Sequence, residues 1–103
     1  MLVNNTDTNQ LKNKRYKLLL FIAGGEPNSM IASKNITKIC KKYIPDNYEL
    51  EVIDIFKNLQ KAIEYDILIT PTLIISDSNN KSVLVGNFYT YEKLLNVIGV
   101  SSD

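Results

Sequence analysis

Residues 24–29, Gly-Gly-Glu-Pro-Asn-Ser, follow directly on the apolar run of residues 17–23, Lys-Leu-Leu-Leu-Phe-Ile-Ala. A short run of this kind suits a strand that is covered on both faces, as at the centre of a parallel or mixed sheet. The two glycines end the strand, and Pro27 suits the first turn of a helix, where a missing amide donor costs least. Further along, Thr-Pro-Thr at residues 70–72 opens a second apolar stretch, and its proline can only begin a strand or bend its entry.

The segment after residue 27 has the periodicity of an amphipathic helix. Apolar residues recur every three or four positions up to residue 43, and lysines fill the other side. Asn28 or Ser29 can cap the first turn, and Pro-Asp-Asn at residues 45–47 ends the helix. Residues 48–55 alternate in polarity and predict a second strand. The apolar side is expected to comprise Met30, Ile31, Ile36, Ile39, Cys40 and Tyr43 in the helix, and Leu50 and Val52 in the strand.

The second half of the chain predicts a short helix and a hairpin. Residues 57–65 place Leu59, Ala62 and Ile63 at helical spacing. Residues 67–75 are apolar and β-branched except around Thr-Pro-Thr at 70–72, and they indicate a strand that the proline begins or whose entry it bends. Ser-Asp-Ser-Asn-Asn-Lys at residues 76–81 is typical of a hairpin turn, because such residues cap their own turns and tolerate left-handed backbone. The returning strand is expected at residues 82–85.

A closing helix completes the predicted order βαβαββα. Gly86 and Asn87 interrupt the last strand, Thr90 can cap the helix, and Gly99 lies near its end. A parallel βαβ unit is thereby joined through a second helix to an antiparallel hairpin and a terminal helix. The predicted fold is an α/β fold, a central mixed sheet flanked by helices. It resembles the thioredoxin arrangement.

This resemblance indicates a thioredoxin site without its chemistry. In thioredoxins a C-x-x-C motif follows a central strand, and a proline, usually cis, faces it from a later strand; Pro71 is the corresponding cis-proline candidate. If Pro27 matches the proline inside that motif, the cysteine positions fall on Gly25 and Asn28. Neither residue can exchange a thiol for a disulfide, which requires a thiolate. An enzyme that uses glutathione or peroxide is therefore disfavoured, and we expect no enzymatic activity.

Composition limits the remaining function classes. The 103 residues carry a net charge of +1, which does not indicate binding to nucleic acid or to an anionic membrane. Cys40 is the only cysteine and histidine is absent, so we expect no intrachain disulfide, metal site or cofactor, and Cys40 is expected to be a small buried residue. We expect one domain at residues 16–99, tails at 1–15 and 100–103, no secretory signal and a cytoplasmic location.

Several short motifs, in this order and spacing, resemble the KaiB family of bacterial clock and clock-derived proteins. The resemblance covers roughly residues 16–98. Each motif alone is weak, and their combination is specific. The motifs are Ala23-Gly24, Pro27-Asn28-Ser29, Val52-Ile53-Asp54, Lys57-Asn58 and Thr70-Pro71-Thr72-Leu73.

The resemblance implies a regulator that binds a KaiC-type ATPase or a related signalling partner and forms a homo-oligomer, either a dimer or a tetramer. It also implies a metamorphic protein, whose second half can rearrange into an alternative βαββααβ fold. The turn at residues 76–80 favours the hairpin, so we expect the thioredoxin-like form. The implied partner-binding residues are Lys34, Glu51, Lys57 and Asn58, and the implied fold-switch residues are Thr70, Pro71, Gly86 and Asn87.

Three departures bear on the partner. The family tends to carry basic residues at the positions of Ile31, Glu51 and Asp66, and changes of rim charge alter partner choice more than fold. A clock-derived role in timing or stress adaptation is therefore one hypothesis. The alternative is a redox-inactive, thioredoxin-like adaptor whose groove between Pro27 and Pro71 binds an extended peptide segment.

Overall fold

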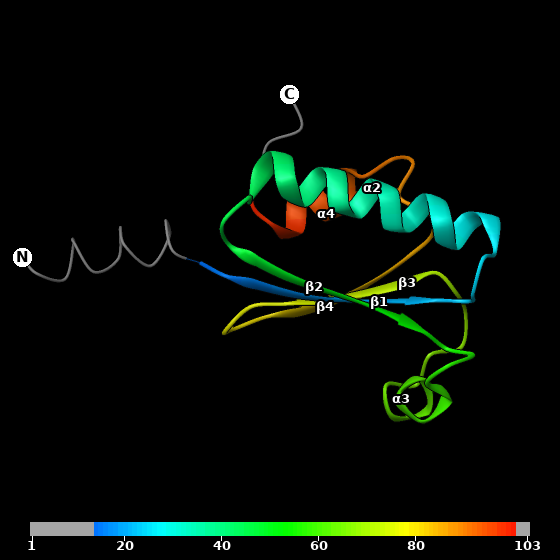
Figure 1. Cartoon of the computed structure of the whole chain (residues 1–103). Helices are drawn as coiled ribbons and strands as arrows, with labels where there is room; N and C mark the ends of the chain where they lie inside the picture. The colour runs from blue at the N-terminus through cyan, green and yellow to red at the C-terminus, as the bar shows by residue number, and fades with distance from the viewer. Residues whose placement is uncertain (1–13, 101–103) are drawn as a thin grey trace, which may run out of the picture.

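The computed structural model describes residues 14–100 (Figure 1). Almost all of the two expected tails, residues 1–15 and 100–103, therefore lies outside the described residues. The element order is βαβαββα, which confirms the predicted order. The elements are β1 (Tyr16–Ile22), α2 (Pro27–Tyr43), β2 (Tyr48–Asp54), α3 (Leu59–Glu64), β3 (Thr72–Ser76), β4 (Lys81–Val85) and α4 (Glu92–Val97).

The four strands form one mixed sheet in the order β2-β1-β3-β4. β1 pairs in parallel with β2, in the register Tyr16 to Tyr48, and antiparallel to β3, in the register Leu20 to Leu73. β3 and β4 form the antiparallel hairpin. Helices α2 and α4 lie on one side of the sheet and α3 lies on the other (Figure 1).

Strand β1 is covered on both faces, as its continuous apolar sequence predicts. Leu18 and Leu20 belong to the core beneath α2 and α4, whereas Leu19 and Phe21 belong to a second cluster on the α3 side. The first cluster is the larger. Its members include Ala32, Ile36, Ile39, Cys40, Leu73, Ile75, Leu94, Leu95 and Ile98, and the second adds Ile53 and Ile74.

The predicted hairpin turn is held by Asp77. Its Oδ1 accepts hydrogen bonds from the amides of Asn79 (2.7 Å) and Asn80 (2.8 Å), and its Oδ2 lies 3.2 Å from Nζ of Lys14. The two amide hydrogen bonds, with the lysine as a smaller contributor, lower the pKa of this carboxyl group. The turn therefore satisfies its own polar groups and returns the chain antiparallel to β3.

The start of α2 differs from the sequence prediction. The cap is Glu26 rather than Asn28 or Ser29. Ser29 is buried because its hydroxyl accepts a hydrogen bond from the Ala23 amide (3.1 Å), which holds the helix close to the end of β1. The small residues Ser29 and Ala32 thus face the sheet, and Met30 and Ile31 are 57% and 41% exposed instead of buried.

Two further predictions were wrong in detail. In β2, Ile53 is buried because it packs into the cluster on the α3 side, whereas Val52, which points to the opposite face of the sheet, is 42% exposed. β3 begins at Thr72, directly after Pro71, which was expected to begin the strand or bend its entry. Helix α4 begins after Tyr91 with no side-chain cap, so Thr90 does not cap it.

Among residues 14–100, no helix has the length and apolar character that a membrane span needs.

Candidate partner-binding site

One end of the sheet gathers the connections in which most of the sequence motifs lie. Strands β1 and β2 are parallel and end here, β3 is antiparallel to β1 and begins here, and β4 ends here. The segments 23–26, 55–58, 65–71 and 86–91 consequently leave or enter the sheet at the same end. The topology therefore places the motifs around Pro27, Lys57, Pro71 and Asn87 at this end.

At the position of the thioredoxin C-x-x-C motif, residues 25–28, the start of α2 is capped by Glu26. The carboxylate of Glu26 accepts hydrogen bonds from the amides of Asn28 (3.0 Å) and Ser29 (2.9 Å), and from the Ser29 hydroxyl (2.9 Å). The bond from the Asn28 amide, followed by that from the Ser29 hydroxyl, lowers the pKa of Glu26. The amides that would stabilise a thiolate at a helix N-terminus are thus already engaged.

Asp54 fastens the adjacent connections to each other. Its Oδ1 accepts hydrogen bonds from the amides of Gly24 (3.1 Å) and Phe56 (3.0 Å), so one carboxylate joins the ends of β1 and β2. Its main-chain oxygen accepts from the amides of Lys57 and Asn58 (both 3.0 Å). These contacts assign Asp54 a structural role in positioning the turn that precedes α3.

Gly24 permits Phe56 to lie across the end of β1. Gly24 has a positive φ of 54°, and a Cβ atom added there would lie 3.3 Å from Cδ2 of Phe56. A side chain at this position would meet both an unfavourable backbone conformation and the aromatic ring. The glycine therefore sets where Phe56 is presented.

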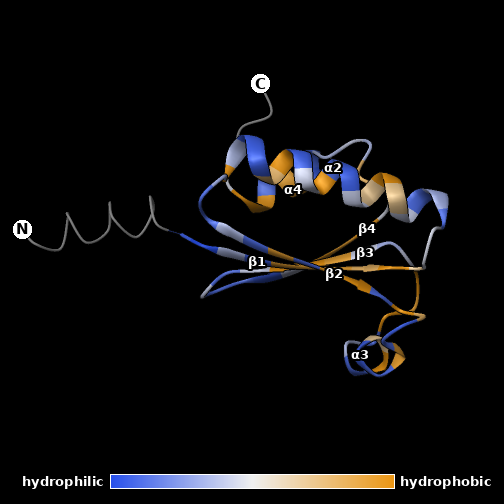
Figure 2. Ribbon diagram, viewed as in Figure 1, coloured by the Kyte–Doolittle hydropathy of each residue, from blue (hydrophilic) through white to orange (hydrophobic). Residues whose placement is uncertain are grey.

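The apolar face of α3 points to solvent. Phe56, Leu59 and Ile63 follow one another at helical spacing and are 76%, 62% and 61% exposed, whereas Ala62 is the buried residue of the helix. Leu68, at 96%, and Ile69, at 56%, are exposed in the connection to β3. Figure 2 shows hydrophobic stretches of ribbon on α3 and on the chain that flanks it. We refer to Phe56, Leu59, Ile63, Leu68 and Ile69 as the α3 surface.

The residues implied by the KaiB resemblance lie in two places. Lys57 and Asn58 are exposed between β2 and α3, and the Asn58 side chain also caps α3 by accepting from the Lys61 amide (3.3 Å). Glu51, on β2, lies 3.4 Å from Nζ of Lys61, in an ion pair on the α3 side of the sheet. Lys34 lies on α2, on the opposite side, so the structure does not bring it together with the other three.

The residues of the implied fold-switch region are brought together across the sheet end. The Thr70–Pro71 peptide bond is cis, and the main-chain oxygen of Pro71 accepts from the Gly86 amide (3.1 Å). The side chain of Asn87 contacts that of Asn28 (3.3 Å). Asn87 forms two further hydrogen bonds. Its Oδ1 accepts from the Tyr89 amide (2.9 Å), and its main-chain oxygen accepts from the Asn35 side chain (3.1 Å).

The sequence analysis did not single out Phe56, Leu59, Ile63, Leu68 and Ile69 as an exposed surface. The helical spacing of Leu59, Ala62 and Ile63 indicated an apolar face, but spacing does not tell whether a face is turned inward. Cys40, by contrast, is 1% exposed, and burial raises the pKa of its thiol to about 11. A thiol of this kind is a core residue rather than a nucleophile at pH 7.

The solved structures to which the fold is similar include thioredoxins. The germline-specific thioredoxin Deadhead from Drosophila melanogaster matches with a TM-score of 0.67 and 16% identity, over 95% of this chain and 91% of that one. Chloroplastic thioredoxin z matches with a TM-score of 0.71 and 12% identity, over 93% and 86%. At these identities the similarity shows the fold alone.

Sequence comparison shows the family. The KaiB domain family matches residues 19–100. The circadian clock oscillator protein KaiB of Thermostichus vulcanus is 42% identical, with coverage of 79% of this chain and 85% of the relative. That of Trichodesmium erythraeum is 41% identical, with coverage of 79% and 88%. The chain belongs to the KaiB family.

Proposed function

We propose that this protein is a non-enzymatic regulator that binds a KaiC-type ATPase, or a related signalling partner, through the α3 surface and the end of β2. Membership of the KaiB family supports a KaiB-like regulatory role. The observation that carries the proposal is the exposed apolar surface formed by Leu59 and Ile63 on α3 and by Phe56 in the turn before it, each more than half exposed. A helix that turns its apolar residues to solvent leaves a patch that a partner can bury.

The α3 surface has the features of an interface with an apolar centre. Aromatic and aliphatic side chains that become buried on association carry most of the binding energy, and Phe56 and Leu59 are of this kind. The aromatic ring of Phe56 lies beside Gly24 and is 76% exposed, so a partner can bury most of it. Phe56 is therefore the expected anchor.

Charged residues form the rim of this surface. Lys57 is exposed next to Phe56, and the ion pair between Glu51 and Lys61 lies beside α3. Rim charges mainly set association rates and exclude wrong partners. Glu51 and the exposed Asp66 stand where the family tends to carry basic residues, and this difference supports a partner whose charges differ from those of a clock ATPase. A role in stress adaptation is part of this proposal.

The test is co-elution with a nucleotide-loaded KaiC-type ATPase from a sizing column. We expect a complex at about micromolar concentrations, a loss of about 1–2 kcal/mol of binding free energy for Lys57→Glu, and a larger loss for Phe56→Ala. Lys17→Glu is the matched control, because Lys17 is exposed on β1 and away from the turn at Lys57. Absence of a complex at tens of micromolar would contradict a KaiC-type ATPase as the partner, and equal affinities for Lys57→Glu and Lys17→Glu would contradict a binding site at Lys57. Elution of the chain alone tests the proposed dimer or tetramer.

A second candidate is the redox-inactive adaptor that binds an extended peptide. It is favoured by the exposure of Leu68 and Ile69, which directly precede the cis bond at Pro71. Extended peptides bind through main-chain hydrogen bonds, with side chains in alternate pockets. Ile69→Asp should then abolish peptide binding while Leu59→Asp leaves it intact. Loss of binding with both Leu59→Asp and Ile69→Asp would favour the regulator, because both residues belong to the α3 surface.

A further inference from the structure

The outer face of α2 carries an uninterrupted group of lysines. Helix α2 contains Lys34, Lys38, Lys41 and Lys42 and no acidic residue over its seventeen positions, although the whole chain has a net charge of only +1. At about 100° per residue, these four side chains fall within an arc of about 100°. The buried residues of the helix lie on the opposite side. We refer to Lys34, Lys38, Lys41 and Lys42 as the α2 lysine face.

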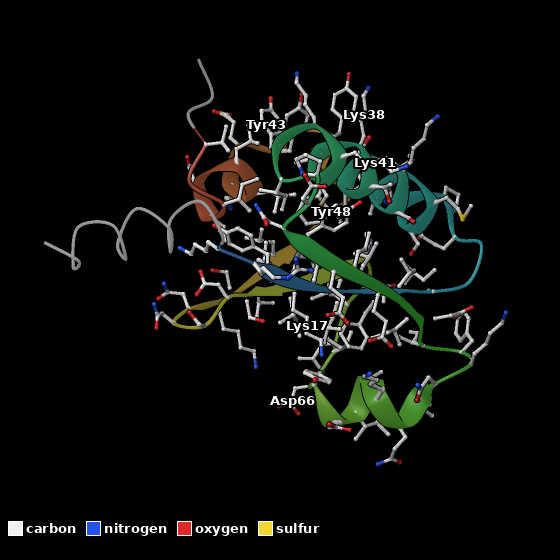
Figure 3. All side chains as sticks on the ribbon, turned by 60° about the vertical axis from the view of Figure 1, so that its left-hand side comes forward. Lys17, Lys38, Lys41, Tyr43, Tyr48 and Asp66 are labelled. Atoms are coloured by element: carbon white, nitrogen blue, oxygen red, sulfur yellow. The ribbon has the colours of Figure 1, made fainter. Side chains whose placement is uncertain are left out.

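All four lysines are exposed, and none forms an ion pair with another residue in the range 14–100. The one aromatic contact is between Lys42 and Tyr43, whose ring centroid lies 5.2 Å from Nζ. Figure 3 shows Lys38 and Lys41 on the outer side of α2, with Lys17 below it on β1 and Asp66 near α3. Four exposed acidic residues, Glu49, Glu51, Glu64 and Asp66, belong to β2, α3 and the following turn; the other two in the described part of the chain, Asp46 and Glu92, follow the end of α2 and begin α4.

Helix stability alone does not explain this arrangement. Lys41 and Lys42 lie in the last turn, where positive charge interacts favourably with the helix dipole. Lys34 and Lys38 lie outside that turn, and the pairs Lys34–Lys38 and Lys38–Lys42 have the one-turn spacing at which like charges repel. The lysine face therefore costs the isolated helix some stability, and a negatively charged partner would offset that repulsion.

We propose that the α2 lysine face is a second docking surface, which binds an acidic helix of a partner protein. Lys34 to Lys42 spans about 12 Å along the axis, which corresponds to about two turns of a facing helix. Met30 and Ile31 are exposed one turn before Lys34, at 57% and 41%. The matching partner segment has carboxylates at helical spacing and an apolar group beyond one end.

The same features disfavour two other anionic ligands. Single-stranded nucleic acid binds where aromatic rings are available for base stacking, whereas Tyr43 and Tyr48 beside the lysines are only partly exposed. An amphipathic helix on a membrane inserts an apolar face along its length. On α2 the exposed apolar residues, Met30 and Ile31, stand at one end only.

The test measures binding of a synthetic helical peptide that carries glutamates one turn apart and a leucine pair at one end. Binding should be detected at submillimolar concentration, perturb backbone amide signals along α2, and weaken at least tenfold when salt is raised from about 0.1 M to about 1 M, since the Debye length falls from about 10 Å to about 3 Å. At about 0.1 M salt, the variant Lys38→Glu/Lys41→Glu should bind the peptide about tenfold more weakly than the unmodified protein does.

The matched control is Lys17→Glu/Lys81→Glu, which changes the net charge equally on two exposed residues of β1 and β4. It should bind the peptide nearly as well as the unmodified protein. Circular dichroism of each variant separates lost binding from lost structure. Because Lys38 and Lys41 lie outside the α3 surface, these variants should still bind the KaiC-type ATPase, so failure of one proposal is distinguishable from failure of the other.

Three results would overturn the proposal. The first is no peptide binding at about millimolar concentration. The second is equal loss of binding in the two double variants, which would show that only net charge matters. The third is binding of phosphatidylglycerol vesicles or of a single-stranded RNA oligonucleotide in preference to the acidic peptide, with the same dependence on Lys38 and Lys41.

Discussion

The two faces of the sheet are covered unequally. On one face, α2 and α4 bury a continuous core in which Leu18, Leu20 and Ile36 are fully inaccessible. On the other, α3 contributes Ala62 to the interior and turns Leu59 and Ile63 outward. The first face holds the fold together, and the second provides apolar surface that a partner can cover. The difference separates stability from recognition in a small domain.

The contrast extends to the polar residues. The outer side of α2 is positively charged and is well separated from the apolar residues that build the core. Around α3, acidic and basic residues surround exposed hydrophobic side chains, as in the ion pair between Glu51 and Lys61. The two helices thus present different chemistry to solvent.

The largest expected effect comes from truncating matched isoleucines on the two faces. Ile36→Ala should lower the free energy of unfolding by about 2–5 kcal/mol, because Ile36 is completely buried and the change leaves a cavity. Ile63→Ala should change it by no more than about 0.5 kcal/mol, because Ile63 is 61% exposed. Urea denaturation followed by circular dichroism measures both. Equal losses would show that Ile63 is covered in solution, and a concentration dependence would identify a second copy as the cover.

The next effect is a difference in thiol reactivity. Burial raises the pKa of Cys40 to about 11, so its reactive thiolate is scarce at pH 7.5 and its side chain is shielded. A cysteine placed on the open face, Leu59→Cys in a Cys40→Ser background, should react at least about 100-fold faster with a disulfide reagent. Mass spectrometry of quenched samples measures both rates. Comparable rates would mean that the α2 face opens readily.

The smallest effect concerns the two adjacent glycines. Gly24→Ala should destabilise the protein by about 1–2 kcal/mol, since the residue has φ of 54° and its new methyl group would press on Phe56. Gly25→Ala should be neutral or stabilising by up to about 1 kcal/mol, because no atom lies within 4 Å of its Cβ position. Thermal denaturation compares them. If the two substitutions had equal effects, Gly24 would not be what positions Phe56.

Local sequence patterns predicted most of the elements. The run of residues 17–23 indicated a strand buried on both faces, and the structure places Leu18 and Leu19 in different clusters, as expected for such a strand. The turn at residues 76–81 carries its own hydrogen-bonding groups in Asp77, so its type followed from neighbouring residues. Both features depend on interactions between residues that are close in the chain.

Predictions failed where burial depended on distant segments. Periodicity predicted that Met30, Ile31 and Ile36 lie on the apolar side of one helix. The hydrogen bond of Ser29 to the end of β1 decided which side of that helix faces the sheet. In the same way, packing on the α3 side of the sheet buried Ile53, while Val52, on the opposite face of β2, stayed exposed. The Glu26 cap was missed because Asn and Ser are the more common capping residues.

The sequence by itself determined the order of the elements, the absence of cysteine at Gly25 and Asn28, and the charge of α2, because these properties belong to residue types and to spacing along the chain. Only the tertiary structure decided that the apolar side of α3 faces solvent and that Asn87 contacts Asn28 across the sheet end. The physical reason is that hydrophobic spacing shows which side chains share a face, whereas burial requires a second segment to pack against that face.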